Sequence, residues 1–403
     1  MPWARTDVRE QRVKFVVRAA SGKEGMSALC REFGISRPTG YRWRKRFVQA
    51  GSVIALQERS RRPVHSPART APAWEERVVA LRQDHGWGAK KIAVMLSEAG
   101  TALPLITINR ILKRRGLVEN EPRQYEASRR FERAAPNQLW QMDGKGEYRV
   151  SDGTCYPLSI LDDHSRFAVG LYGLPNFTAE LVHGCVVRTF ERYGVPEAML
   201  MDRGSLWWST TNGYGLTWLA VRLIEQGIAL NYGGVRHPQT QGKVERFHRT
   251  LDQALRHGGV PEQLAQWPER LEEFRHLYNE VRPHEALSMK RPMQRYRESP
   301  RAYQAQPREW EYPSGSVVRR LNPAGCVYWL KRLWFVSEAL AGRWVRLETV
   351  RDAVLVSYRH MYVRELDLQR RSTRPLVVSR EVDGEGRPPS GLPAFPVNPQ
   401  TNV

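Results

Sequence analysis

The sequence predicts a multidomain chain in which an all-α amino-terminal third, an α/β middle and an all-β carboxyl-terminal third follow one another. Three observations predict this order. Helical spacing of apolar residues dominates residues 25–117, and strand-length apolar runs alternate with helical patterns over 137–259. Short strands separated by Gly, Asn and Pro follow from residue 316. At 403 residues the chain has room for two to four domains.

Positive charge is concentrated at the amino-terminal end. The formal net charge is +21, and residues 1–72 contain 16 Lys and Arg against 5 Asp and Glu. This excess indicates a polyanionic partner, and nucleic acid fits better than a membrane because no apolar run approaches roughly 18 residues. The first ten residues lack the apolar segment of a signal peptide, and the four cysteines lie far apart. We therefore expect reduced thiols in the cytosol.

Residues 25–47 have the pattern of a helix-turn-helix. A short helix starting at Met26 ends before Gly34, which permits the turn, and Ser36 can cap a second helix. Basic and polar residues then face outward from the second helix, as in a helix that enters the major groove. The predicted DNA contacts here are Arg37, Thr39, Arg42, Lys45 and Arg46. The alternative is an ordinary helical hairpin with a solvated charged face.

A second, less sharply marked helix-turn-helix is predicted further along the chain. Residues 74–117 contain three helical patterns, and the last one carries Arg110 and Arg114 as predicted DNA contacts. The basic segment 58–72 before it is predicted to be a linker, which either follows DNA phosphates or is simply solvated. A polar connector over 121–136 leads into the middle of the chain.

Three carboxylates stand out in the α/β middle. Three successive strands are predicted over 137–175, and the first carries Asp143 among apolar residues. A short buried strand then ends at Asp202, and Glu245 lies near the start of a long amphipathic helix. Taken singly, each residue has a purely structural alternative: Asp143 a buried salt bridge, Asp202 a turn role, and Glu245 a favourable interaction with the helix dipole. Asp162 and Asp163 fall at a predicted hairpin turn and are left out of the site.

The order of three antiparallel strands, helix, strand, helix, strand and helix is that of the ribonuclease-H-like fold. Residues 137–290 resemble the catalytic core of DDE transposases and retroviral-type integrases, and the front of the chain resembles bacterial insertion-sequence transposases. The matching motifs are WQMDGKG, LDDHSR, MDRGS, HPQTQGKVERFHRTL and YNEVRPHEAL. The resemblance implies Asp143, Asp202 and Glu245 as catalytic acids and metal ligands, with Lys243 and Arg246 facing DNA.

The resemblance also implies what the protein does. It implies a transposase that binds terminal inverted repeats, holds two Mg²⁺ or Mn²⁺ ions, cuts DNA and joins the ends to target double-stranded DNA. We expect a homo-oligomer, at least a dimer on DNA, in the bacterial cytoplasm with the nucleoid. The alternatives are a DNA-binding regulator with an inert core, and a ribonuclease-H-like nuclease without joining activity.

Two departures from the family pattern fall between the second and third acids. Arg203 stands where relatives usually have Asn, and Asp202 and Glu245 are separated by more residues than is usual. The surplus falls in residues 206–217, which contain Trp207 and Trp208. These two side chains are predicted either to stack on DNA beside the active site or to pack against the following helix.

Short strands over 316–366 predict a small SH3-like β-barrel. The predicted domains are 1–57, helix-turn-helix; 58–72, linker; 73–120, second helix-turn-helix; 121–136, connector; 137–300, catalytic core with closing helices; 310–370, barrel; 371–403, disordered tail.

Overall fold

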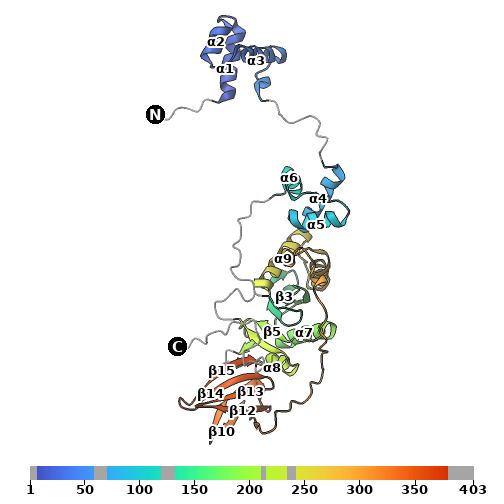
Figure 1. Ribbon diagram of the computed structural model, residues 1–403, viewed down its shortest axis with the longest axis vertical. Coiled ribbons are helices and arrows are strands. Elements are labelled where there is room, and N and C mark those ends of the chain that lie inside the picture. Colours follow the sequence, from blue (N-terminus) through green and yellow to red (C-terminus); the bar gives the residue numbers. More distant parts are fainter. Residues whose placement is uncertain (1–6, 59–69, 119–131, 210–214, 234–241, 380–403) are drawn as a thin grey trace. The chain divides into compact units, whose positions relative to one another are not determined.

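The computed structural model describes most of the chain and divides it into two compact units, residues 1–71 and residues 72–403 (Figure 1). The described residues are 7–58, 70–118, 132–209, 215–233 and 242–379. Most of the predicted linker 58–72 and of the connector 121–136 lies outside these ranges. Within them, none of the helices has the length and apolarity needed to cross a bilayer.

The first unit is a three-helix bundle made of α1 (Val8–Ser21), α2 (Met26–Glu32) and α3 (Arg37–Ala50). The predicted helix-turn-helix is α2 and α3. Gly34 adopts a φ of +62° at the turn, and the Ser36 side chain caps α3 by accepting from the Thr39 N–H at 3.4 Å. Gly40 is buried, and a Cβ at this position would lie only 2.5 Å from Cys30 Sγ. The close crossing of α2 and α3 therefore requires glycine.

Helix α1 was not among the elements predicted from the sequence. It supplies Phe15, Val16 and Ala19 to the core of the first unit. The sequence does contain a signal for the start of α1, because Asp is a common N-cap residue. In the structure the Asp7 side chain accepts from the Arg9 N–H at 2.9 Å. The helix completes the bundle, because α2 and α3 alone leave Leu29 and Cys30 without a covering layer.

The three predicted helices of 74–117 are α4 (Pro72–His85), α5 (Ala89–Glu98) and α6 (Leu105–Arg114). They share a core and pack against Leu277 and Val281. Ion pairs continue this contact, with Arg291 Nη2 at 2.5 Å from Glu98 Oε2 and Lys90 Nζ at 2.9 Å from Glu285 Oε2. The helices predicted as a separate domain, 73–120, thus belong to the second compact unit.

The centre of the second unit is a mixed sheet in the order β4-β3-β1-β5-β8. Strands β4, β3 and β1 pair antiparallel, whereas β1, β5 and β8 pair parallel. The predicted first strand is interrupted, because β1 and β2 both pair with β3 on either side of a break at 145–147. The strands are β1 (Trp140–Gly144), β2 (Tyr148–Val150), β3 (Gly153–Asp162), β4 (Ala168–Leu174), β5 (Ala198–Met201) and β8 (Ala229–Tyr232).

Helices cover both faces of this sheet. On one face, Trp140 and Met142 pack with side chains of α7 (Ala179–Tyr193) and α8 (Trp218–Glu225). On the other face, alternate residues of β3 and β4 pack with α9 (Gly242–Gly258) and α10 (Trp267–His276). The apolar stripe predicted for α9 is confirmed, since Val244, Phe247, Leu251 and Leu255 are all buried. This arrangement is that of the ribonuclease-H-like fold predicted from the order of the elements.

The carboxyl-terminal strands form an open antiparallel sheet, in the order β15-β14-β13-β12-β9, and a separate hairpin of β10 and β11. The predicted barrel is not confirmed, because the edge strands β9 and β15 do not pair with each other. The sheet shares a hydrophobic core with the central mixed sheet and its helices α7 and α8, and Tyr358 Oη donates to Glu225 Oε1 at 3.0 Å. Its strands are β9 (Val317–Arg320), β10 (Cys326–Trp329), β11 (Arg332–Phe335), β12 (Trp344–Val350), β13 (Ala353–Tyr358), β14 (Met361–Asp367) and β15 (Ser372–Ser379).

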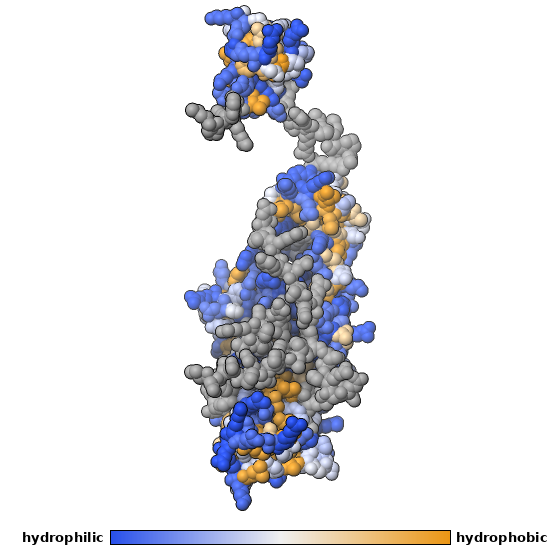
Figure 2. Space-filling model, turned by 60° about the vertical axis from the view of Figure 1, so that its left-hand side comes forward, coloured by the Kyte–Doolittle hydropathy of each residue, from blue (hydrophilic) through white to orange (hydrophobic). Residues whose placement is uncertain are grey.

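One further feature of this region differs from prediction. Residues 372–379, predicted to be part of a disordered tail, form β15 because they pair with β14, and residues 380–403 lie outside the described ranges. Figure 2 shows apolar side chains beside hydrophilic ones at the end of the unit that carries this sheet. Leu330, Leu333 and Trp344 are among the exposed apolar residues there.

Candidate active site

Asp143 lies on β1 with its side chain directed away from the buried face of that strand. Trp140 and Met142 point into the core, so the alternate residues Gln141 and Asp143 face the other side. Asp143 pairs with Ser159 of β3, and 20% of its side chain is exposed. The strand therefore holds the Asp143 carboxylate in a partly exposed position that a ligand can reach.

Asp202 comes directly after β5, the parallel neighbour of β1. Gln141 pairs with Leu200, so continuing the register by two residues brings Asp143 level with Asp202. The Asp202 carboxylate is held by its own turn, in which Oδ1 accepts from the Gly204 N–H at 2.9 Å. A Cβ at Gly204 would lie 3.0 Å from that oxygen, which makes a side chain at this position unfavourable.

Glu245 lies in the first turn of α9, on the exposed side of the helix. The apolar stripe that begins at Val244 anchors the opposite side to the sheet. Arg246 is also exposed, as the prediction of a DNA contact requires. Two helix residues later, His248 Nε2 is 3.0 Å from Ser159 Oγ, and its Nδ1 is 3.9 Å from Asp143 Oδ2. Burial lowers the pKa of His248 to about 4 and keeps it neutral.

Electrostatics link the three acids. Burial raises the pKa of Asp143 to about 7, and the negative charges of Asp202 and Glu245 act in the same direction. The Gly144 N–H, which hydrogen-bonds to the carboxylate, opposes this shift. Even so, no three acidic, His or Cys side chains among the described residues are arranged to hold a metal ion. The acids are neighbours whose side chains do not converge on one point.

A cleft of about 230 Å³ opens beside Asp143 and Asp202. Its walls come from the loop after β1, from Tyr156 and Phe177, and from residues 204–207. Trp207 and Trp208 are buried, with 4% and 9% exposure, and Trp207 lines the cleft. Trp207 belongs to the core cluster that also contains residues of α8, whereas Trp208 packs on Tyr232 of β8. Packing against the following helix, the second predicted alternative, is thus supported for Trp207.

The rings of this segment also hold Arg203. The Arg203 guanidinium lies 5.1 Å from the centre of the Trp208 ring, which in turn lies 5.0 Å from Tyr232. The residue that departs from the family pattern is thus an exposed cation held on a buried aromatic, directly after Asp202. Residues 210–214, which belong to the surplus between the acids, lie outside the described ranges.

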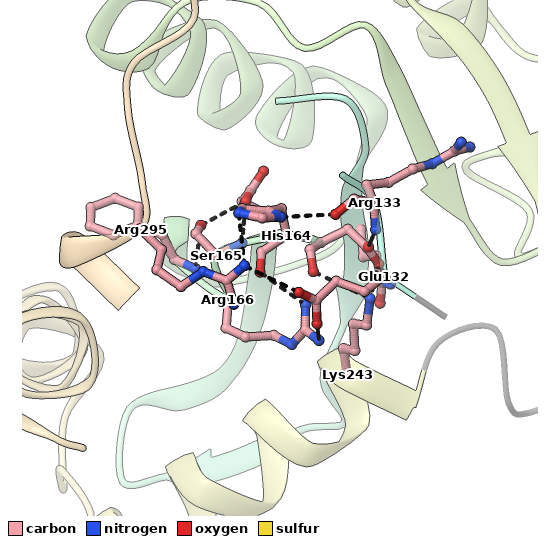
Figure 3. Close-up of polar contacts among 11 residues, drawn as sticks. Glu132, Arg133, His164, Ser165, Arg166, Lys243 and Arg295 are labelled. Atoms are coloured by element: carbon pink, nitrogen blue, oxygen red, sulfur yellow. Dashed lines mark hydrogen bonds and ion pairs between the residues drawn. The ribbon is translucent and has the colours of Figure 1, made fainter. Parts of the chain in front are cut away.

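Lys243 was predicted to contact DNA phosphate, but its ammonium pairs with the buried carboxylate of Asp163. It also donates to the Asp163 carbonyl at 3.2 Å, and burial lowers its pKa to about 8. Asp162 has the turn role that was predicted, since it accepts from the Ser165 and Asn137 N–H groups at 2.7 and 2.8 Å. Figure 3 shows Lys243 reaching from the start of α9 toward the turn that carries His164 and Arg166.

The predicted DNA contacts of the helix-turn-helix modules fall into two groups. Exposed residues are Arg37, Arg42, Lys45, Arg110 and Arg114, the last of which also lies 3.2 Å from Glu75. The other two are less exposed and contact their own domain: Thr39 Oγ1 is 2.9 Å from Ser36 Oγ, and Arg46 donates to the Gln57 carbonyl at 2.8 Å. Arg46 was predicted to face outward and instead lies over the Trp43 ring at 5.0 Å.

Comparisons with known proteins agree with this architecture. Family models described as "Integrase core domain" match residues 133–238 and 226–292. Models described as "Helix-turn-helix domain" and "Homeodomain-like domain" match residues 11–63 and 39–112.

Similar solved structures include a viral integrase domain and a viral intasome. One is the HTLV-2 integrase catalytic core domain in complex with magnesium, in a dimeric form, at 15% identity and a TM-score of 0.31, covering 40% of this chain and 97% of that one. Another is a simian T-cell lymphotropic virus intasome in complex with a PP2A regulatory subunit, at 13% identity and a TM-score of 0.38, covering 69% of this chain and 91% of that one. Because identities and TM-scores are low, the assignment rests on the family models. The family models support a transposase or integrase of the DDE superfamily, in which an integrase core follows helix-turn-helix domains.

Proposed function

We propose that this protein is a DNA transposase that cuts and joins DNA at Asp143, Asp202 and Glu245. One observation carries the proposal: Asp143 lines a cleft together with Asp202, and the negative charges of Asp202 and Glu245 raise the pKa of Asp143 in addition to the effect of burial. A carboxylate whose pKa is raised by neighbouring carboxylates is stabilised by a cation among them. A structural ion pair would instead supply that cation from a neighbouring Lys or Arg.

The donor set fits a hard divalent cation. All three proposed ligands are carboxylates, the oxygen ligands that Mg²⁺ and Mn²⁺ prefer. When bound, a pair of such ions supplies activation of the attacking oxygen and stabilisation of the leaving oxygen. Asp143 and Asp202 would hold the ions from the sheet, and Glu245 from α9. The neutral His248 ring, which is close to Asp143, helps to orient that carboxylate.

The first unit provides the binding surface in this proposal. Arg37, Arg42 and Lys45 are exposed on α3, the second helix of the helix-turn-helix, where a major-groove reader contacts DNA. A transposase handles the two ends of its element together, so we propose at least a dimer on DNA. Element ends and target DNA are then both double-stranded partners.

The test uses the full-length protein, DNA that carries the element ends, and Mg²⁺ or Mn²⁺. We expect metal-dependent cleavage that leaves 3′-hydroxyls, followed by joining to target DNA. The second candidate, a regulator with an inert core, is favoured by Arg203 and by the lack of converging metal ligands among the described residues. A regulator binds the same DNA without cutting it, and a nuclease cuts without joining.

A further inference from the structure

Asp163, in the turn between β3 and β4, is a fully buried carboxylate with partners from three segments. Its Oδ1 accepts from Gln141 Nε2 at 2.8 Å and also pairs with Lys243, while Oδ2 accepts from the Arg133 N–H at 2.8 Å. Its own N–H donates to the Leu139 carbonyl at 2.9 Å. A turn residue with only a backbone role needs none of the side-chain partners.

Two of these partners lie at matching places beside the proposed catalytic acids. Gln141 precedes Asp143 by two residues on β1, and the two side chains share one face of that strand. Lys243 precedes Glu245 by two residues at the start of α9. One carboxylate oxygen of Asp163 therefore ties the strand that carries the first acid to the helix that carries the third.

The apolar contacts of α9 with the sheet define this geometry less sharply, and the directional contact of His248 with Ser159 lies further along the helix and reaches β3. Val244 and Phe247 pack against apolar residues, and such contacts have no preferred direction. A buried, charge-assisted hydrogen bond does have one, and its energy falls steeply when the two groups move apart.

We propose that Asp163 is a positioning residue for the active site: it fixes the start of α9 against β1 and so sets the separation between Glu245 and Asp143. The inference rests on the proposed function, because it assumes that these acids work together. It also gives Lys243 a role inside the protein, in place of a contact with DNA phosphate.

The test compares four full-length variants with the parent: Asp163→Asn, Lys243→Gln, the double variant, and Glu132→Gln as the matched control. Glu132 pairs with Arg166 at 2.7 Å and with Arg295 at 3.3 Å beside the same turn (Figure 3). Its ion pairs go to these two arginines, and its charge acts on Lys243 only through space, where it raises the pKa of that ammonium. Its loss therefore perturbs the turn and the local charge but leaves the hydrogen bonds of Asp163 in place.

The readouts are Mn²⁺ affinity by calorimetry, the kcat of joining at saturating DNA, DNA affinity by fluorescence anisotropy, and thermal unfolding. We expect each single variant of Asp163 or Lys243 to lower Mn²⁺ affinity and kcat by about 10-fold to 100-fold, as residues that orient metal ligands do. DNA affinity should stay at the parental value. The double variant should regain part of the loss, because Asn and Gln can form a neutral hydrogen bond. Glu132→Gln should match the parent.

Two results overturn the inference. In the first, Lys243→Gln weakens DNA binding and its salt dependence while Asp163→Asn joins DNA normally, which makes Lys243 a phosphate contact. In the second, the variants are less stable, yet their folded fraction keeps the parental Mn²⁺ affinity and kcat, which makes the pair a purely structural one. A parent that binds Mn²⁺ but never cuts DNA refutes the proposed function instead, and the Mn²⁺ affinities still decide this inference.

Discussion

The exposed face of α3 and the cleft beside β1 hold charge in opposite ways. On α3, Arg37, Arg42 and Lys45 lie in solvent, where salt screens each charge and neighbours affect it little. In the cleft, Asp143 is largely buried, and the charges of Asp202 and Glu245 alter its pKa. Exposed charges of this kind contribute separately to binding, whereas Asp143, Asp202 and Glu245 affect one another and should act as one unit. The two regions should therefore respond differently to substitution, salt and acid.

The largest expected effect is the loss of one acid from the coupled set. Glu245→Gln keeps the size of the side chain but removes a charge, so cleavage and joining by the full-length protein should fall by about 10³-fold or more. Asp143→Asn and Asp202→Asn should behave alike, and combining the changes should add little. DNA affinity should change little, because most of the predicted DNA contacts lie in the helix-turn-helix regions and the neighbouring Arg246 is kept. Activity on end DNA and anisotropy measure the two quantities.

Glu269→Gln is the matched control for Glu245→Gln. Glu269 also lies in the first turn of a helix, α10, and is exposed, but it is remote from the acids in the sequence and does not line the cleft. If both variants join DNA as well as the parent, Glu245 serves only the helix dipole, and the set of three acids is wrong.

A smaller effect is expected from the exposed cations. Replacing Arg37, Arg42 and Lys45 by Gln should weaken DNA binding by about 10-fold to 100-fold at low salt and reduce the slope of log affinity against log salt by about 0.9 per lost contact. Joining at saturating DNA should be preserved. Lys23→Gln, an exposed cation of the same unit between α1 and α2, should leave the slope nearly unchanged. Equal slopes for all the variants would place the DNA elsewhere.

The same contrast explains what the sequence could and could not predict. The apolar stripe of α9 and the cap at Ser36 depend on neighbours within one turn, so spacing alone located both. The partner of Lys243 is 80 residues away, and nothing local distinguishes it from an exposed cation such as Arg246. Arg46 was misplaced for the same reason, since its acceptor is a carbonyl beyond the end of its helix.

Sheet closure was the other property that local patterns did not decide. Alternating short strands predict a barrel and an open sheet equally well, and the choice depends on what the strands pack against. Here the open sheet shares a core with the central mixed sheet and its helices α7 and α8. The hydrogen bond of Tyr358 to Glu225 joins the same two parts. Strand β15 extends this sheet, which is why part of the predicted tail is ordered.

At acid pH the second unit should lose stability, because it contains a buried histidine, His284, that is neutral in the folded state. Burial lowers the pKa of His284 to about 3, and the neighbouring Arg282 and Lys91 act in the same direction. The ring donates to the Tyr278 carbonyl at 3.0 Å. Because the unfolded chain takes up the proton near pH 6.5, the free energy of unfolding should fall as pH drops from 6.5 toward 3, by up to about 1.4 kcal/mol per pH unit.

His284→Phe isolates this contribution. The aromatic contact with Tyr278, whose ring centre is 4.5 Å away, is kept, but the proton-binding group is removed. Urea unfolding between pH 7 and pH 4 should show a smaller pH dependence in the variant than in the parent, even though the variant is less stable at pH 7. Parallel curves for the two proteins would mean that other groups cause the acid sensitivity.

The smallest expected effect separates two arginines of one helix. Arg46 donates to the Gln57 carbonyl and lies over Trp43, so Arg46→Gln should destabilise the first unit by about 1 kcal/mol. Arg42 is exposed, and Arg42→Gln should change stability by less than about 0.5 kcal/mol while weakening DNA binding more. Hydrogen exchange of the α1–α3 amides in the full-length protein measures the first quantity and anisotropy the second. If Arg46→Gln instead weakens DNA binding without faster exchange, its side chain leaves Trp43 to reach DNA, and α3 uses a wider face than the exposed residues indicate.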